Sequence, residues 1–182
     1  MTRVSLSGKE QSIAFIWSWY EDQKEALHDF RTKIFTAIIT SSSSFNAKFI
    51  GMTTDELNAY FENSEEELEH LVCFDLISAT EAVLRSDFYA KVYNKDKSDI
   101  ARLFRDLEKD KGGKISLESD IIDNWKEIIA TRKTNFSDFL GLINYRHWLA
   151  HGRYWTPKLG KQYTPSITYN IAERIFDIVN EN

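Results

Sequence analysis

The chain has 182 residues, the length of one ordinary domain, which is enough to bury a single sizeable hydrophobic core. With 7 glycines and 2 prolines against 42% hydrophobic and 14% aromatic residues, the composition favours long helices over many short strands. The net charge of −5, from 23 Lys and Arg against 28 Asp and Glu, argues as a total against a nucleic-acid partner. The single cysteine, Cys73, excludes an intrachain disulfide and a cysteine-based zinc knuckle, and we expect it to be a small buried side chain in a reducing compartment.

The N-terminal segment MTRVSLSGKEQS has neither the apolar core nor the cleavage pattern of a secretion signal. The longest apolar stretches, such as residues 14–17, fall far short of the roughly 18 residues that a membrane span requires. We therefore expect one cytoplasmic domain over residues 1–182, with no membrane partner.

Three sequences of the form Ser/Thr-x-x-Glu predict helix starts, because this capping box satisfies two of the free amides at a helix N-terminus; they begin at Ser7, Thr53 and Ser64. After Ser7, helical spacing predicts one long helix to about Thr40, through Ile13, Ile16, Trp17, Tyr20, Leu27, Ile34 and Ile38. Residues 41–44 are all serine and predict a loop. Residues 64–94 are apolar nearly all round, which predicts a central, largely buried helix; one face carries Leu68, Leu71, Val72, Leu76, Ala79 and Val83, and the other Phe74, Ile77, Leu84 and Phe88.

Shorter amphipathic helices are predicted over residues 100–107, 121–129 and 167–178, where apolar residues recur three and four positions apart. The sequence Lys111-Gly112-Gly113-Lys114 is not a phosphate loop, because Glu108 stands where that motif needs its first glycine. The predicted fold is all-α, an up-and-down helical bundle with a long first helix.

The segment NFSDFLGLINYRHWLAHGRYW, residues 135–155, predicts a helix over 136–151, with Asn135 as N-cap and Gly152 in the left-handed position after the last turn. Arg146 projects from the middle of its apolar stripe, where a charge must be paired or used; the stripe is Phe139, Leu142, Ile143, Leu149 and Ala150.

Asn144, His147 and His151 fall together on the opposite face, with Trp148 beside them. They form either a solvated polar face, a candidate site, or a metal site, because His147 and His151 have the i, i+4 spacing that grips a divalent ion. The metal alternative lacks the glutamate of H-E-x-x-H and a recognisable third ligand.

The charge of this region is opposite to that of the whole chain. Between residues 131 and 163, six cations face one acid, a net of +5; they are Arg132, Lys133, Arg146, Arg153, Lys158 and Lys161 against Asp138. Interleaved aromatic residues can stack on unpaired bases while the cations follow a phosphate backbone; they are Tyr145, Trp148, Tyr154, Trp155 and Tyr163. Residues 53–82, by contrast, contain nine acids and no Lys or Arg; these acids either solubilise a helix face or offer a basic inhibitor a place to dock.

The motif Arg146-His-Trp-Leu-Ala-His151 resembles the R-x4-6-H signature of the HEPN superfamily, and its setting YRHWLAHGRYW is similar to the RiboL-PSP-HEPN branch. The stretch from Glu81 to Phe88 is similar to the helix that precedes the motif in that branch, so the resemblance spans residues 64–182, while residues 41–63 match nothing.

The resemblance implies a metal-independent, cofactor-free endoribonuclease, a toxin or antiviral defence effector, with Arg146 and His151 as catalytic residues and a 2′,3′-cyclic phosphate product. A homodimer is implied too, because residues five apart on a helix point about 140° apart and motifs from two chains must meet. We expect Trp148 at that interface, supporting roles for Asn144 and His147, and RNA contacts from Arg153, Tyr154, Trp155, Lys158 and Lys161. An antitoxin or other inhibitory partner is expected.

Glu81 and Arg85 have two interpretations: a buried i, i+4 ion pair that fixes helix register, or a support that holds Arg146 or His151. Two other functions stay open. One is a HEPN-like dimerisation or RNA-binding module without turnover, and the other is an unrelated helical protein that binds metal through His147 and His151.

Overall fold

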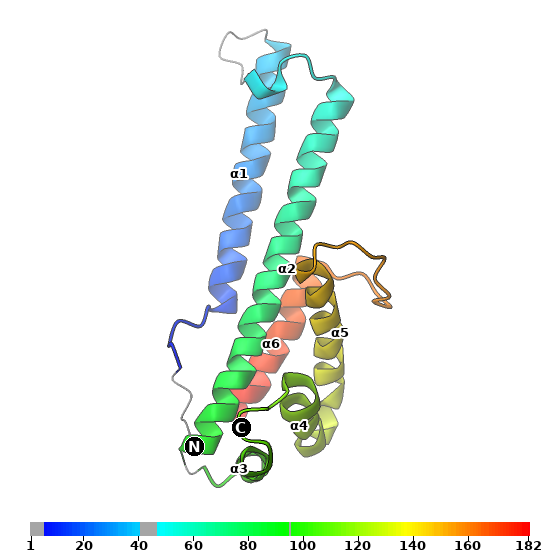
Figure 1. Ribbon diagram of the computed structural model, residues 1–182. Helices are drawn as coiled ribbons and strands as arrows, with labels where there is room; N and C mark the ends of the chain where they lie inside the picture. The colour runs from blue at the N-terminus through cyan, green and yellow to red at the C-terminus, as the bar shows by residue number, and fades with distance from the viewer. Residues whose placement is uncertain (1–5, 41–46, 95) are drawn as a thin grey trace. The chain divides into compact units, whose positions relative to one another are not determined.

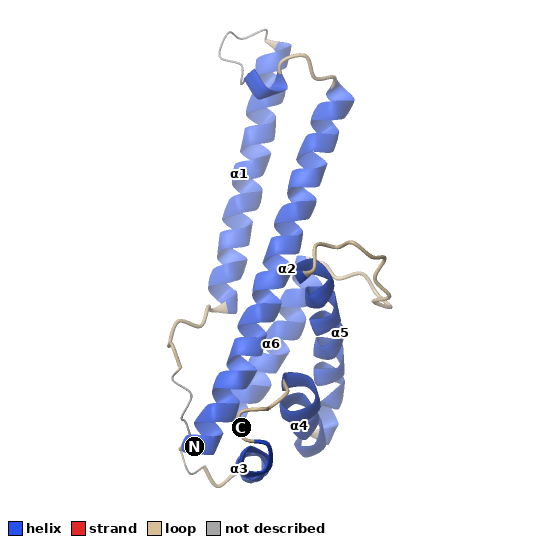
Figure 2. Cartoon of the chain, viewed as in Figure 1, coloured by secondary structure: helices blue, strands red, loops and turns tan. Residues whose placement is uncertain are grey.

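The computed structural model describes residues 6–40, 47–94 and 96–182, and the described chain is all-helical, with no strand (Figures 1 and 2). Its α-helices are α1 (Ile13–Ile39), α2 (Thr54–Tyr93), α3 (Asp99–Lys111), α4 (Asp123–Ile128), α5 (Lys133–Ala150) and α6 (Pro165–Glu181). Short turns of 3₁₀ helix span Ala47–Phe49 and Ala130–Arg132, and a π-helical turn spans Leu117–Ile122. The all-α prediction is confirmed, and the loop predicted at residues 41–44 lies outside the described residues.

Over the described ranges, no helix combines the length and apolar character that crossing a bilayer would need. The chain packs into two compact units, residues 14–72 and residues 73–182 with the N-terminal segment up to Ile13, and α2 contributes to both. The single domain over residues 1–182 stays a prediction.

Residues 14–72 form a helical hairpin. Its two helices run antiparallel, because residues later in α1 contact residues earlier in α2. Tyr20 Oη donates to Glu69 Oε1 (3.3 Å), Lys24 Nζ pairs with Glu65 Oε1 (3.5 Å), and Arg31 Nη2 donates to Asn58 Oδ1 (2.9 Å). Buried apolar side chains fill the turn end of the hairpin; they are Ile34, Phe49, Leu57 and Phe61.

One of the three predicted helix starts is confirmed. At Thr53 the capping box is complete: the Thr53 amide donates to Glu56 Oε2 (2.7 Å), and the Glu56 amide donates to Thr53 Oγ1 (3.3 Å). The start at Ser64 is wrong, because Ser64 lies inside α2 and its hydroxyl donates to the Tyr60 carbonyl one turn earlier (2.8 Å). The start at Ser7 is also wrong: α1 begins at Ile13, and the Ser7 hydroxyl instead accepts from the Lys9 amide in a non-helical segment (3.2 Å).

The second half of α2 packs with α3 to α6 around the main core. α5 and α6 lie side by side, and α4 contacts both α3 and α5 (Figure 1). The core is rich in aromatic rings, and Trp125 of α4 stacks on Phe136 of α5 with centroids 6.0 Å apart. Cys73 is buried as predicted, and the Thr168 hydroxyl of α6 donates to its sulfur (3.5 Å). The largely buried helix predicted over residues 64–94 is correct for this half, whereas Leu71, in the hairpin, is 57% exposed.

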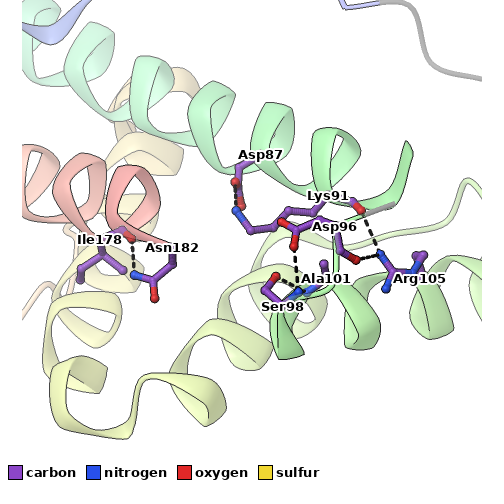
Figure 3. A network of polar contacts seen from close by, with 8 residues as sticks. All are labelled: Asp87, Lys91, Asp96, Ser98, Ala101, Arg105, Ile178 and Asn182. Carbon is purple, nitrogen blue, oxygen red and sulfur yellow. Dashed lines mark hydrogen bonds and ion pairs between the residues drawn. The ribbon is translucent and has the colours of Figure 1, made fainter. Parts of the chain in front are cut away.

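A polar network closes the end of this core (Figure 3). Asp87 and Lys91, one turn apart on α2, form a buried ion pair, and the Lys91 ammonium also lies 5.3 Å from the centroid of the Trp125 ring. Arg105 of α3 donates to the carbonyls of Asp96 (2.6 Å) and Lys91 (3.3 Å). These bonds tie the α2–α3 connection to both helices.

Candidate functional site

The candidate site is built on α5, and the two ends of this helix differ in how well the sequence predicts them. The helix begins at Lys133, because the preceding 3₁₀ turn runs directly into it, so the prediction of Asn135 as N-cap is wrong. The C-terminal prediction is confirmed: Ala150 is the last helical residue, His151 is the C-cap, and Gly152 has a φ of 74°, in the left-handed region that favours glycine.

The two predicted faces of α5 are present. Phe139, Leu142 and Ile143 are buried in the core, whereas Ala150 is exposed because the helix ends there, which corrects its place in the apolar stripe. The opposite face is as predicted, and Asn144, His147 and His151 are all exposed.

Arg146 is held against the second half of α2. Its Nε atom lies 3.5 Å from Oε1 of Glu81, and its guanidinium carbon lies 5.9 Å from the centroid of the Phe74 ring. The Arg146 side chain is 31% exposed and that of Glu81 14%. Within the described part of the chain, neither Arg146 Nε nor Glu81 Oε1 makes a hydrogen bond. The contact is therefore an ion pair whose two facing atoms are buried but do not form a hydrogen bond with each other.

Burial raises the pKa of the Glu81 carboxyl above its usual value, and the positive charges of Arg146, Arg85 and His147 oppose this effect only in part. Glu118 raises it slightly further. Arg85 is exposed, so the expectation of a buried Glu81–Arg85 pair is wrong. Of the two interpretations of Glu81, the geometry favours the one in which its carboxylate supports Arg146.

His151, the second residue of the motif, lies one position after the last helical residue of α5. It is exposed at the C-terminus of α5, and its ring lies 6.3 Å from that of Trp155, with the two planes inclined by 42°. Arg146 and His151 leave the helix about 140° apart, so one chain presents them in different directions.

Stacked aromatic rings fix the chain that follows α5. The Tyr145 ring lies between those of Trp148 (5.8 Å) and Tyr163 (5.3 Å), and the Trp148 indole Nε1 donates to the main-chain oxygen of Trp155 (2.8 Å). Gly141 makes room for Tyr163, since a Cβ atom at this position would lie 2.2 Å from Tyr163 Oη. Sequence reasoning did not find this packing; the spacing of Tyr145 and Trp148, three positions apart, signals only that pair, since Tyr163 is 18 positions further along the chain.

The predicted RNA-contact residues differ in how available they are. Tyr154 and Trp155 are exposed and so is Lys158, whereas Arg153 is half-buried. Lys161 is engaged, because its ammonium pairs with Asp138 of α5 (2.8 Å).

The net charge of +5 overstates the free positive charge, because three of the six cations have acidic partners: Arg132 with Glu181 (2.6 Å), Arg146 with Glu81 (3.5 Å) and Lys161 with Asp138 (2.8 Å). Two of these acids lie outside the counted segment and reach it only through the fold. The region is therefore less basic than its sequence, and within the described residues its exposed cations outside these three ion pairs are Lys133 and Lys158.

Nothing in the described ranges brings three or more His, Cys, Asp or Glu side chains together in a way that could hold a metal ion. His147 and His151 thus gain no third ligand from the fold over those ranges. No family model, curated protein or solved structure matches this chain.

Proposed function

We propose that the protein is a HEPN-like, metal-independent endoribonuclease in which Arg146 and His151 form the catalytic site. The observation that carries the proposal is the Glu81–Arg146 contact. It holds a partly exposed guanidinium in place, at the one position where the sequence motif requires an arginine.

The chemistry fits these two side chains. In this reaction the ribose 2′-oxygen forms a bond to phosphorus as the bond from phosphorus to the 5′-oxygen breaks, which leaves a 2′,3′-cyclic phosphate and a 5′-hydroxyl. An imidazole such as that of His151 accepts the 2′-hydroxyl proton or supplies the proton of the departing 5′-oxygen. The guanidinium of Arg146 neutralises the charge on the phosphate oxygens through two donors.

The supporting residues have separate roles in this proposal. Glu81 orients Arg146, and His147, exposed on the same helix, contributes positive charge beside the phosphate. Asn144 offers an amide one turn before Trp148, and Arg85 adds positive charge near Glu81.

The angular separation of Arg146 and His151 supports a two-fold homodimer, in which Arg146 of one protomer meets His151 of the partner subunit. Trp148, whose indole N–H donates within its own chain, is our proposed interface residue.

The test is RNA cleavage in excess EDTA, with analysis of the product ends. Arg146→Ala and His151→Ala are expected to abolish cleavage, whereas the matched surface variants Arg102→Ala and His28→Ala retain it, since those two side chains lie outside the site. The proposal fails if the folded wild-type protein leaves RNA intact, or if cleavage survives in either site variant.

The two other functions remain as outcomes of the same assay. Tight RNA binding without cleavage supports a non-catalytic module, and activity that appears only with an added divalent ion supports the metal alternative at His147 and His151. Growth arrest on expression, relieved by Arg146→Ala, supports the toxin or defence role and makes an inhibitory partner worth isolating.

A further inference from the structure

The turn after α5 presents an aromatic ring to solvent. Tyr154 is 83% exposed, and its ring and that of Trp155 form a T-shaped pair with a centroid distance of 4.7 Å and an interplanar angle of 71°. Trp155, 36% exposed, lies between two rings, because its other contact is with His151 at 6.3 Å. The three rings His151, Trp155 and Tyr154 therefore form a connected series that starts at the proposed catalytic histidine.

This presentation is built into the backbone. Gly152 and Arg153 both have left-handed φ angles, 74° and 57°, a conformation that is sterically unfavourable for a non-glycine residue such as Arg153. Two hydrogen bonds to Trp148 hold it: the Arg153 amide donates to the Trp148 carbonyl (3.1 Å), and the Trp148 indole donates to the Trp155 carbonyl (2.8 Å). Tyr154 is thus the outward residue of a fixed turn.

The surroundings favour an unpaired nucleobase as the occupant. Lys158, which is exposed, follows Tyr154 by four positions, and residues 152–160 contain no acid, so the turn carries positive charge beside an exposed aromatic ring. A nucleic-acid strand supplies both a base for the ring and a phosphate for the lysine.

We propose that Tyr154 is a stacking platform for an unpaired base next to the phosphate at His151, so that the substrate is single-stranded RNA or an RNA loop. This inference rests on the proposed function for the presence of a phosphate at His151. A base in a duplex is already stacked and paired on both sides, and it can reach Tyr154 only after it leaves the helix.

The expected effect is measurable. Stacking of one base on an aromatic side chain is worth about 1–3 kcal/mol, so removal of the Tyr154 ring weakens binding of single-stranded RNA by about 5- to 150-fold. Binding to an RNA duplex changes little, because the duplex does not use the platform.

The experiment measures the Kd of the full chain for a 2′-O-methyl oligouridine, which lacks the attacking hydroxyl and cannot be cleaved, and for a 2′-O-methyl duplex. We expect Tyr154→Ala to weaken binding of the single strand alone and Tyr154→Phe to restore it. Ile128→Ala, an exposed apolar residue on α4, is the matched control.

Several results overturn the platform: equal single-strand affinity in wild type and Tyr154→Ala, equal loss for strand and duplex, or no binding of either. A changed oligomeric mass in Tyr154→Ala with unchanged RNA affinity also overturns it and assigns the ring to a protein contact. The two proposals fail separately. Binding that depends on Tyr154 without any cleavage of ordinary RNA refutes only the nuclease, whereas cleavage that is indifferent to Tyr154 refutes only the platform.

Discussion

The contact between Gly141 and Tyr163 leads to a prediction whose sign is opposite to that of ordinary helix propensity. Gly→Ala inside a helix normally stabilises by about 1 kcal/mol. At Gly141 the new Cβ atom would lie 2.2 Å from Tyr163 Oη, short of van der Waals contact by about 1.2 Å. Tyr163 is buried and stacked on Tyr145, so the ring cannot swing away freely, and such overpacking costs about 1–3 kcal/mol. We expect Gly141→Ala to lower the free energy of unfolding by up to about 2 kcal/mol.

The clash is with one atom, which allows a double-mutant cycle. In Gly141→Ala with Tyr163→Phe the hydroxyl is gone, and the next nearest atom, Cζ, lies at 3.4 Å, an ordinary contact. Urea denaturation should therefore give a favourable coupling of about 1–3 kcal/mol between the two substitutions. Gly113→Ala, where nothing lies within 4 Å of the new Cβ, is the matched control and should be neutral or stabilising. Additive effects at positions 141 and 163, within about 0.5 kcal/mol, would refute the packing argument.

Three further predictions concern α2. Because burial raises the folded-state pKa of Glu81 above its unfolded-state pKa, the free energy of unfolding falls as pH rises from the lower of these two pKa values to the higher. Glu81→Gln should remove this pH dependence in a series of urea titrations and preserve stability at neutral pH, while RNA cleavage falls about 100-fold. A clear loss of stability with full activity would instead show a purely structural carboxylate. In thermal unfolding, Thr53→Ala should lower the free energy of unfolding by about 0.5–2 kcal/mol through loss of the helix cap, whereas Ser64→Ala, inside the helix, should change it by less than about 0.5 kcal/mol. Equal effects of the two substitutions would contradict a start of α2 that is capped by Thr53. Lys91→Met should cost about 3–5 kcal/mol in chemical denaturation by leaving the buried Asp87 carboxylate unpaired, and adding Asp87→Leu should recover most of it; no recovery would show that the loss has another cause.

Sequence patterns predicted correctly those features of the fold that depend on interactions between residues close together in the chain. The all-helical class, the capping box at Thr53 and the end of α5 at Gly152 each depend on residues within one turn of each other. The Ser-x-x-Glu pattern gave a wrong helix start at Ser64, because the residues on both sides of it are helical. The Ser64 hydroxyl donates to the Tyr60 carbonyl and does not accept from a backbone amide.

The candidate site could be predicted only in part. Periodicity placed Arg146 on the buried side of α5 and His151 on the exposed side. Arg146 pairs with Glu81, which lies 65 positions earlier in the chain. The Glu81 carboxylate pairs with Arg146 and not with the nearby Arg85 because of how α2 and α5 pack, which no local spacing determines. The positive charge was overestimated for the same reason, since Glu81 and Glu181 reach their cations only in the folded chain.

Subunit mixing tests the central claim most directly. Arg146→Ala and His151→Ala proteins are each assayed for RNA cleavage in excess EDTA, and are then mixed under conditions that exchange subunits. If Arg146 meets His151 of the partner subunit, each mixed dimer has one complete site, and random exchange should restore about a quarter of wild-type activity. A wild-type protein that is inactive in EDTA, or a mixture that stays inactive although mixed dimers form, would contradict a site shared between two chains.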